Sequence, residues 1–516
     1  MGVVTPADWF LTRDERGNPA TWIPAWSEGN RAEPLIHGAT YFQRLVAEVE
    51  ALRAGDYVFF TDWRGDPDEL LRDGGPTIRD LFCQAAERGV VVKGLVWRSH
   101  LDKFQYSEEE NQHLGEAIEA AGGEVLLDQR VRVGGSHHQK LVVIRHPEAP
   151  QRDIAFAGGI DLCHSRRDDE SHEGDPQAVQ MAECYGSTPP WHDVQLQIRG
   201  PAVGVLDTTF RERWNDPTPL DALSPVAWVM DKLRGADLSA DRLPEQPPDP
   251  PACGPHTVQV LRTYPDAHFR YAFAPRGERS IARAYNKVVP RARRLIYVED
   301  QYLWSARVAT LFADALRTNP DLHLVAVIPR HPDVDGRLQL PPNQVGRWQA
   351  IATCQAASPE RVHIFDVENH QGTPVYVHAK VCVIDDTWAC VGSDNLNRRS
   401  WTHDSELSCA VMDSDGEFAR DVRLRLLREH LDRPADGSAD GNLVDPITAV
   451  RDITATAEAL DAWYRSGCQG ERPPGRLRPH KPERLGWRTR VWAEPLYRLI
   501  YDPDGRSYRD RLRNRL

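Results

Sequence analysis

Hydrophobic residues in the first part of the chain follow two different periods. Apolar positions recur at helical spacing over 38–52 and 77–88, whereas 56–63 and 90–97 contain short apolar runs. The first pattern predicts amphipathic helices, and the second predicts buried strands. Strands that alternate with helices of this length predict an α/β architecture around a largely parallel or mixed sheet.

The same order of elements recurs later in the chain. Six blocks match in one order, and the repeat places His138 opposite His378, which lies 240 positions further on (378 minus 138). The other five pairs of blocks are 56–63 with 295–304, 90–97 with 322–329, 124–128 with 361–366, 154–161 with 388–395, and 191–196 with 403–408. Such a repeat indicates an internal duplication, so we expect two related α/β halves.

Changes in composition divide the chain into five segments. Residues 216–256 are rich in proline and are predicted to form a connector, with a helix over 221–234 as an option. The polar residues before position 35 are expected to form an irregular arm on the first half. The predicted segments are 1–34 (N-terminal arm), 35–215 (first half), 216–256 (connector), 257–432 (second half) and 433–516 (helical, arginine-rich tail).

Residues 377–385 carry the first candidate chemistry. Their alternation has the period of a β-strand, so His378 and Lys380 project from one face. Asp385 begins a turn, and the returning strand ends at Gly392, where a glycine allows a ligand to approach the backbone closely.

A second pair of the same kind, His138 and Lys140, occupies the matching position of the first half. Two such pairs meet the needs of phosphodiester chemistry. One neutral imidazole can attack phosphorus, the other, protonated, can act as general acid, and two ammonium groups can neutralise the phosphoryl oxygens. This chemistry uses no metal, and the sequence indicates no metal cluster, so we expect neither a metal nor another cofactor.

A histidine in either role needs a carboxylate on its far nitrogen, which fixes its tautomer and its basicity. The repeat suggests Asp193 for His138 and Glu406 for His378. The candidate catalytic residues are therefore His138, Lys140, Asp193, His378, Lys380 and Glu406.

The pattern H-x-K-x4-D-x6-G-S-x-N over 378–395 resembles the HKD motif of the phospholipase D superfamily. The resemblance extends over residues 30–430 and includes elements that favour the phospholipase branch. These elements are I-Y-V-E-D-Q-Y at 296–302, G-G-I-D-L at 158–162, P-W-H-D-V at 190–194, R-S at 399–400 and D-S-E-L at 404–407.

The resemblance implies two phospholipase D-like α/β halves, each a sheet flanked by helices, related by a pseudo-twofold axis and sharing one active site. It also implies a two-step reaction through a phosphohistidine, with His138 as nucleophile and His378 as general acid. The motifs place Asp161, Asn395, Ser393 and Gly159 beside the substrate, and give Asp385, Asp153, Gly158 and Gly392 a structural part.

The first motif departs from the family pattern at its aspartate, because Arg145 occupies that position. The family aspartate chiefly braces the hairpin, and Asp153, at the start of the returning strand, is placed to take over that bracing. A degenerate first half is therefore an alternative, but the substitution does not require it.

The leading hypothesis is a phospholipase D, a phosphodiesterase that hydrolyses glycerophospholipids or transfers their phosphatidyl group. Three alternatives stay open: a cardiolipin synthase-like phosphatidyltransferase, a nuclease, and a degenerate protein that only binds phospholipid. A formal net charge of -13 counts against a nuclease, because nucleic-acid binders usually carry a basic surface.

The remaining features concern the surroundings of the protein. Nine scattered cysteines without a C-x-x-C pair suggest a reducing compartment, and no stretch reads as a signal peptide or membrane span. We expect a cytoplasmic monomer with a phospholipid substrate and no nucleic-acid partner. The arginine-rich end offers a transient contact with anionic lipid headgroups at the membrane surface, although a solvated basic helix is the simpler interpretation.

Overall fold

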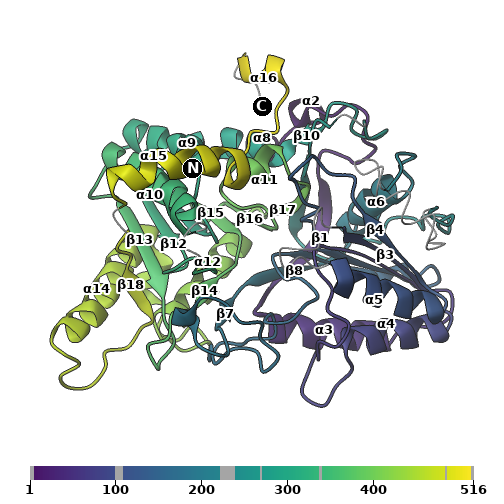
Figure 1. Ribbon diagram of the computed structural model, residues 1–516, viewed down its shortest axis with the longest axis horizontal. Coiled ribbons are helices and arrows are strands. Elements are labelled where there is room, and N and C mark those ends of the chain that lie inside the picture. Colours follow the sequence, from purple (N-terminus) through teal and green to yellow (C-terminus); the bar gives the residue numbers. More distant parts are fainter. Residues whose placement is uncertain are drawn as a thin grey trace.

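One mixed β-sheet runs through the whole molecule and carries helices on both faces (Figure 1). The computed structural model describes residues 5–98, 108–220, 239–267, 270–335, 340–482 and 485–512. The sheet has sixteen strands in the order β18-β13-β12-β11-β15-β16-β17-β9-β1-β8-β6-β5-β2-β3-β4, with β10 beside β9. The α/β class expected from the hydrophobic pattern is confirmed.

The first half contains the predicted alternation of strands and helices. α3, α4 and α5 pack on one face of its part of the sheet, and α6 packs on the other. Its elements are β1 (Ser27–Ile36), α3 (Gly38–Glu50), β2 (Tyr57–Asp62), α4 (Ile78–Glu87), β3 (Val91–Trp97), α5 (Glu108–Ala120), β4 (Glu124–Asp128), β5 (Leu141–Arg145), β6 (Ile154–Gly158), β7 (Trp191–His192), β8 (Val194–Arg199) and α6 (Ala202–Trp214).

The second half repeats this arrangement. The order β8-β6-β5-β2-β3-β4 in the first half corresponds to β17-β16-β15-β11-β12-β13 in the second, which confirms the duplication. Its elements are β9 (His256–Tyr264), β10 (Glu278–Arg279), α8 (Ser280–Val288), β11 (Leu295–Glu299), α9 (Ala306–Thr318), β12 (His323–Val327), α10 (Leu340–Ala357), β13 (Val362–Val367), β14 (Tyr376–Val377), β15 (Val381–Ile384), β16 (Trp388–Gly392), α11 (Arg398–Thr402), β17 (Glu406–Met412) and α12 (Glu417–His430).

The N-terminal arm differs from the irregular segment that we expected. It holds two short helices, α1 (Pro6–Trp9) and α2 (Arg13–Arg16), and the strand β1 begins within it. β1 pairs with β8 on one side and β9 on the other, so it joins the two halves into one sheet. The helical part packs on the second half, where buried Arg16 forms an ion pair with Glu278 at 2.8 Å. Polar positions and Pro34 concealed this strand from the hydrophobic pattern.

Arg145, the departure from the family motif, anchors the proline-rich connector. Its guanidinium is buried between Asp153 at 2.7 Å and Asp207 at 2.6 Å, and it donates to the carbonyl oxygens of Pro247 and Pro248. Asp153 also accepts from the main-chain N–H of His146 at 2.6 Å, so it links the two ends of the hairpin loop. The helix considered over 221–234 lies outside the described residues.

The C-terminal tail packs mainly on the second half, and it also reaches the first half, where Arg476 donates to the carbonyl oxygen of Glu170 and Arg132 donates to that of Gly505. Its elements are α13 (Gly441–Val444), α14 (Pro446–Arg465), β18 (Leu477–Pro479), α15 (Trp487–Leu496), η5 (Tyr497–Tyr501) and α16 (Tyr508–Leu512). β18 pairs with β13, and α15 packs against α10. Within the described chain, no helix combines the length and the apolar character that crossing a bilayer requires.

Candidate active site

The two histidine–lysine pairs lie at equivalent edges of the two halves. Lys140 directly precedes β5, and Lys380 directly precedes β15. β5 is antiparallel to β2, and β15 is antiparallel to β11, so each pair lies at the carboxyl end of the neighbouring parallel strands. Ligand sites of open α/β sheets form at this edge.

Each histidine is held by main chain from the opposite half. The N–H of His138 donates to the carbonyl oxygen of Ser405 at 2.9 Å, and the N–H of His378 donates to that of His192 at 2.8 Å. The short strand β14, which leads into His378, pairs with β7 of the first half. These contacts bring both histidines into the space between the halves.

The carboxylates pair with the histidines in the reverse of the predicted order. Nδ1 of His138 lies 2.9 Å from Oε2 of Glu406, and Nδ1 of His378 lies 2.7 Å from Oδ2 of Asp193. The repeat suggested that each histidine and its acid belong to the same half, and this was wrong. Each motif crosses into the other half, so it meets the acid of the other half.

Two residues predicted to contact substrate instead position these acids. The hydroxyl of Ser393 donates to Glu406 and accepts from the N–H of Leu407 at 3.0 Å. A β-carbon on Gly159 would come within 2.1 Å of Oδ1 of Asp193, so only glycine leaves room for this carboxylate. Ser393 therefore holds the carboxylate of Glu406, and Gly159 leaves room for that of Asp193.

The residues predicted to be structural lie where the main chain is closely packed or hydrogen-bonded. A β-carbon on Gly158 would come within 2.6 Å of the carbonyl oxygen of Val194, and one on Gly392 within 1.9 Å of the hydroxyl of Ser408. The carboxylate of Asp385 accepts from three consecutive main-chain N–H groups at 293–295, at 2.6 to 2.9 Å. It thereby fixes the start of β11 against the hairpin.

The two lysines have different surroundings. Lys140 forms a buried ion pair with Asp161 at 2.9 Å, so this aspartate, predicted to bind substrate, is engaged by the protein. At the equivalent position the second half has Asn395, whose buried Oδ1 has no hydrogen-bond partner within the described structure. Lys380 instead lies 3.4 Å from Oε1 of Gln301, and burial lowers its pKa to about 7.

Burial and neighbouring charge keep both histidines neutral. Burial, followed by the charge of Lys140, holds the pKa of His138 well below its usual range, and burial with Lys380 does the same for His378. The charge of Lys380 also lowers the pKa of His138, and the charge of Lys140 lowers the pKa of His378. The two pairs therefore lie close enough to form one electrostatic centre. Because Nδ1 faces the carboxylate, Nε2 is the nitrogen left to react.

Sequence reasoning missed two further side chains at this centre. Gln301 bridges Lys380 and the hydroxyl of Tyr376, to which its amide donates at 2.8 Å. Its place in the I-Y-V-E-D-Q-Y block was the available signal. Arg166 lies 3.9 Å from the centre of the Trp191 ring and 3.3 Å from Asp161, and no motif pointed to it.

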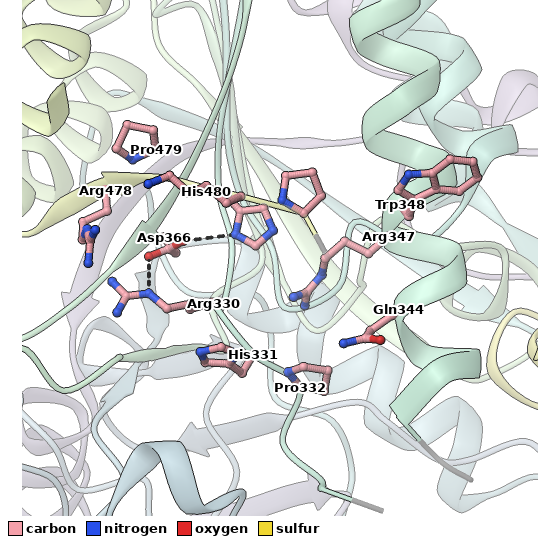
Figure 2. Close-up of a pocket in the computed structure, with 12 residues that line it drawn as sticks. Arg330, His331, Pro332, Gln344, Arg347, Trp348, Asp366, Arg478, Pro479 and His480 are labelled. Carbon is pink, nitrogen blue, oxygen red and sulfur yellow. Dashed lines mark hydrogen bonds and ion pairs between the residues drawn. The ribbon is translucent and has the colours of Figure 1, made fainter. Parts of the chain in front are cut away.

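A cavity of about 330 Å³ lies in the second half, between residues 330–332, α10 and residues 478–482 (Figure 2). Arg347, on α10, links this cavity to the active centre, because it lines the cavity and donates to the carbonyl oxygen of Gln301 at 3.2 Å. Figure 2 shows Asp366 between Arg330 and His480, with which it forms contacts of 2.7 and 3.1 Å. Arg330, Arg347, Arg478 and Lys481 thus bring positive charge to the lining, and Asp366 and Asp461 pair with three of them.

A mixed α/β fold in which two histidine–lysine pairs meet at one centre defines the phospholipase D class of protein. A family model described as "Phospholipase D" matches residues 54–325, more than half of the chain, and the chain belongs to this family. A second model, "Cardiolipin synthase, PLD-like domain", matches residues 342–427.

Individual relatives agree with this assignment. Phospholipase D1 of Schizosaccharomyces pombe is 25% identical over 66% of this chain and 32% of its own length. Phospholipase D alpha 4 of Arabidopsis thaliana is 22% identical over 72% of this chain and 61% of its own length. The chain therefore spans less than two thirds of either relative.

A solved structure shows the same fold. The phosphatidylserine synthase of Haemophilus influenzae superposes with a TM-score of 0.54 and 10% sequence identity, covering 88% of this chain and 98% of the synthase.

Proposed function

We propose that this protein is a phospholipase D, which cleaves the headgroup phosphodiester of glycerophospholipids and releases phosphatidate or its ester. The observation that carries the proposal is the pair of histidines, each bonded through Nδ1 to a carboxylate of the opposite half, at 2.9 and 2.7 Å. Two imidazoles with oriented tautomers and two lysines supply a nucleophile, an acid and compensating charge for one phosphate.

In the first step, Nε2 of His138 forms a bond to phosphorus while the bond from phosphorus to the headgroup oxygen breaks. His378, protonated when the anionic substrate binds, gives its Nε2 proton to the departing alkoxide. In the second step, neutral His378 takes a proton from water or an alcohol, whose oxygen bonds to phosphorus as the phosphorus–nitrogen bond breaks.

Lys140 and Lys380 play unequal parts in this scheme. Lys140 is held by Asp161, so it provides a fixed charge. Lys380 has no carboxylate ion-pair partner among the described residues, and a phosphoryl oxygen can therefore take that place. The buried Oδ1 of Asn395, which accepts no hydrogen bond within the described structure, can accept one from a hydroxyl of the substrate or acceptor.

A second candidate is phosphatidyl transfer between lipids, with an alcohol of a second lipid in place of water. The match of residues 342–427 to a cardiolipin synthase model favours it. The cavity lined by Arg347 is a suitable place for a headgroup or acceptor, because Arg330, Arg347 and Lys481 bring positive charge to it.

The same assay tests both candidates. Purified protein is incubated with mixed phospholipid vesicles, with and without ethanol, and the products are measured by mass spectrometry. A phospholipase D forms phosphatidate and, with ethanol, phosphatidylethanol; a transferase forms diphosphatidylglycerol from phosphatidylglycerol. Absence of all three products would reject the enzymatic proposal, and DNA cleavage in a parallel assay would favour a nuclease.

We also propose that the tail contacts the surface of the substrate membrane. Apolar side chains are exposed along α15, η5 and α16, with 67% of Trp487 and 75% of Leu499 accessible. We call this surface the tail patch; it comprises Trp487, Val491, Trp492, Leu496, Leu499, Ile500, Tyr508 and Leu512. Exposed arginines at 488, 498, 509 and 511 lie among these residues, so the patch combines apolar groups with positive charge. An anionic lipid surface is complementary to that combination.

A further inference from the structure

Four side chains from distant parts of the sequence converge in the interior beside the active site. We call them the histidine cluster: His37, His172, His192 and Glu429. His37 lies between β1 and α3, His172 in the loop before β7, and His192 in β7, whereas Glu429 comes from α12 of the second half. One nitrogen of each ring and one carboxylate oxygen all lie within 4.8 Å of one another.

The donor atoms of the cluster lie close enough together to share one metal ion. Nε2 of His37 lies 2.7 Å from Oε2 of Glu429, while Nε2 of His172 and Nδ1 of His192 lie 2.9 and 3.4 Å from Oε1. Three imidazoles thus point at one carboxylate. A tetrahedral zinc ion with bonds of about 2.0 to 2.1 Å separates its ligand atoms by about 3.3 Å, within the observed spread.

Two of the rings are oriented as metal-bound histidines are. Nδ1 of His172 lies 3.3 Å from Asp168, and Nε2 of His192 lies 2.6 Å from Glu299. Each ring can therefore keep a proton on the nitrogen that faces Asp168 or Glu299 and offer its other nitrogen, which contacts Glu429, to a metal. This is the usual second-sphere arrangement of ligating histidines. Nδ1 of His192 is buried and makes no hydrogen bond within the described structure.

His37 is the ligand that must adjust. Its Nδ1 now accepts from the N–H of Asp193 at 3.4 Å, near the limit of a hydrogen bond. If Nε2 binds a metal, the ring proton moves to Nδ1 and this weak contact is lost. Metal binding would therefore change the main-chain contact of Asp193, whose carboxylate orients His378.

The charges around the cluster also favour a cation. Asp168, Glu299 and Glu429 are three largely buried carboxylates whose ion-pair partners in the described chain are all imidazoles, among them His430 at 2.8 Å from Glu299, with no lysine or arginine. A buried anion requires compensation by a proton, a paired cation or a metal. Imidazole nitrogens with one carboxylate are ligands that suit divalent transition metals.

We propose that the histidine cluster binds one divalent transition-metal ion of the zinc type, held by His37, His172, His192 and Glu429. The ion joins the halves, because its histidines belong to the first half and its glutamate to the second. It lies behind the reacting groups, since the carbonyl oxygen of His192 accepts from the N–H of His378. Its part is to position Asp193 and His378, with no contact to the phosphate.

The test measures metal on the full-length protein, produced without a polyhistidine tag. We expect elemental analysis to find about one zinc per chain, and chelator-treated protein to bind one equivalent of Co2+ with the visible absorption bands of tetrahedral cobalt. His172→Gln and Glu429→Gln should each weaken Zn2+ binding at least 100-fold in calorimetric titrations. The matched control is His323→Gln, which disrupts a second histidine pair, with His363 at 3.2 Å, and should retain full binding.

Substoichiometric binding by wild-type protein, or loss of binding in His323→Gln, would overturn the proposal. If the cluster variants fail to fold, X-ray absorption on zinc-loaded wild-type protein decides. Three imidazoles in the first coordination sphere support the site, and a sphere of oxygen ligands alone rejects it. These readouts do not depend on catalysis, so they stand whether or not the protein cleaves phospholipids.

Discussion

His138 and Glu406 are 268 positions apart in the sequence, and they form a 2.9 Å contact across the boundary between the halves. His378 and Asp193 form the reciprocal contact at 2.7 Å. Each histidine therefore depends on the opposite half for its orientation. The two copies of the duplicated unit make one centre and not two.

Crossed pairing makes a prediction for double variants. Asp193→Asn should lower kcat at least 100-fold through His378, because the amide cannot stabilise the imidazolium as the carboxylate does. Adding His378→Gln to Asp193→Asn should cost little more, since both changes damage the same unit. The pair Glu406→Gln and His138→Gln should behave in the same way. If Asp193 instead acted through His138, the non-additive pairs would be Asp193 with His138 and Glu406 with His378.

The roles of the histidines can be separated with a reactive substrate. His378→Gln lacks the general acid, but a phospholipid analogue with a nitrophenol leaving group needs no protonation. We expect a burst of nitrophenol and a phosphatidyl group trapped on His138, seen by mass spectrometry of the peptide. His138→Gln should give neither. A phosphatidyl group trapped on His378 would reverse the assignment, and His323→Gln should react at the wild-type rate.

The acid–base behaviour of Lys380 predicts the alkaline limb of the pH profile. Burial lowers its pKa to about 7 in the free protein, so the ammonium is present below that pH and lost above it. We therefore expect kcat/KM to fall as pH rises through about 7, because kcat/KM reports groups of the free enzyme. The lowered pKa of His138, which must be neutral to attack phosphorus, places the acid limb well below 6.5.

Lys380→Arg provides the check on this limb. Arginine stays protonated, so the alkaline fall should disappear even if the altered geometry lowers the maximum rate. An unchanged limb near pH 7 in this variant would assign the titration to another group.

The sequence predicted the parts of this site but not how they pair. Local alternation was enough to place His138 and His378 on strand edges, because side-chain direction depends only on neighbouring residues. The crossing of β14 onto β7 depends on contacts between the halves, and an alignment of the repeat contains no information about them. The histidine cluster was missed for the same reason, since its members show no metal-ligand spacing along the chain.

Arg145 leads to a prediction about stability and not about catalysis. Its buried guanidinium holds Asp153, Asp207 and the connector, so Arg145→Leu removes the buried cation that the two carboxylates share and leaves Asp207 with Arg211 alone. We expect a loss of about 3 to 5 kcal/mol in the free energy of unfolding, measured by urea denaturation. The kcat of the remaining folded protein should be close to that of wild type.

The control for this effect is Arg79→Leu, which removes an exposed pair with Asp80 and should cost less than about 1 kcal/mol. A large loss of kcat in folded Arg145→Leu would instead support a catalytic defect in the first motif.

The tail patch predicts that membrane binding and catalysis can be separated. Replacing both Trp487 and Leu499 by serine removes two of the most exposed apolar groups, each worth on the order of 2 kcal/mol when buried in an apolar environment. The double variant should bind anionic phospholipid vesicles at least tenfold more weakly in sedimentation assays. Its rate on a short-chain phospholipid below the micellar concentration should be unchanged, because these residues do not contact the centre.

Trp22→Ser is the matched control, since Trp22 is 83% exposed but lies in the arm. Equal vesicle binding by wild type and the double variant, or a wild-type dimer that the variant converts to a monomer, would assign the patch to a protein contact.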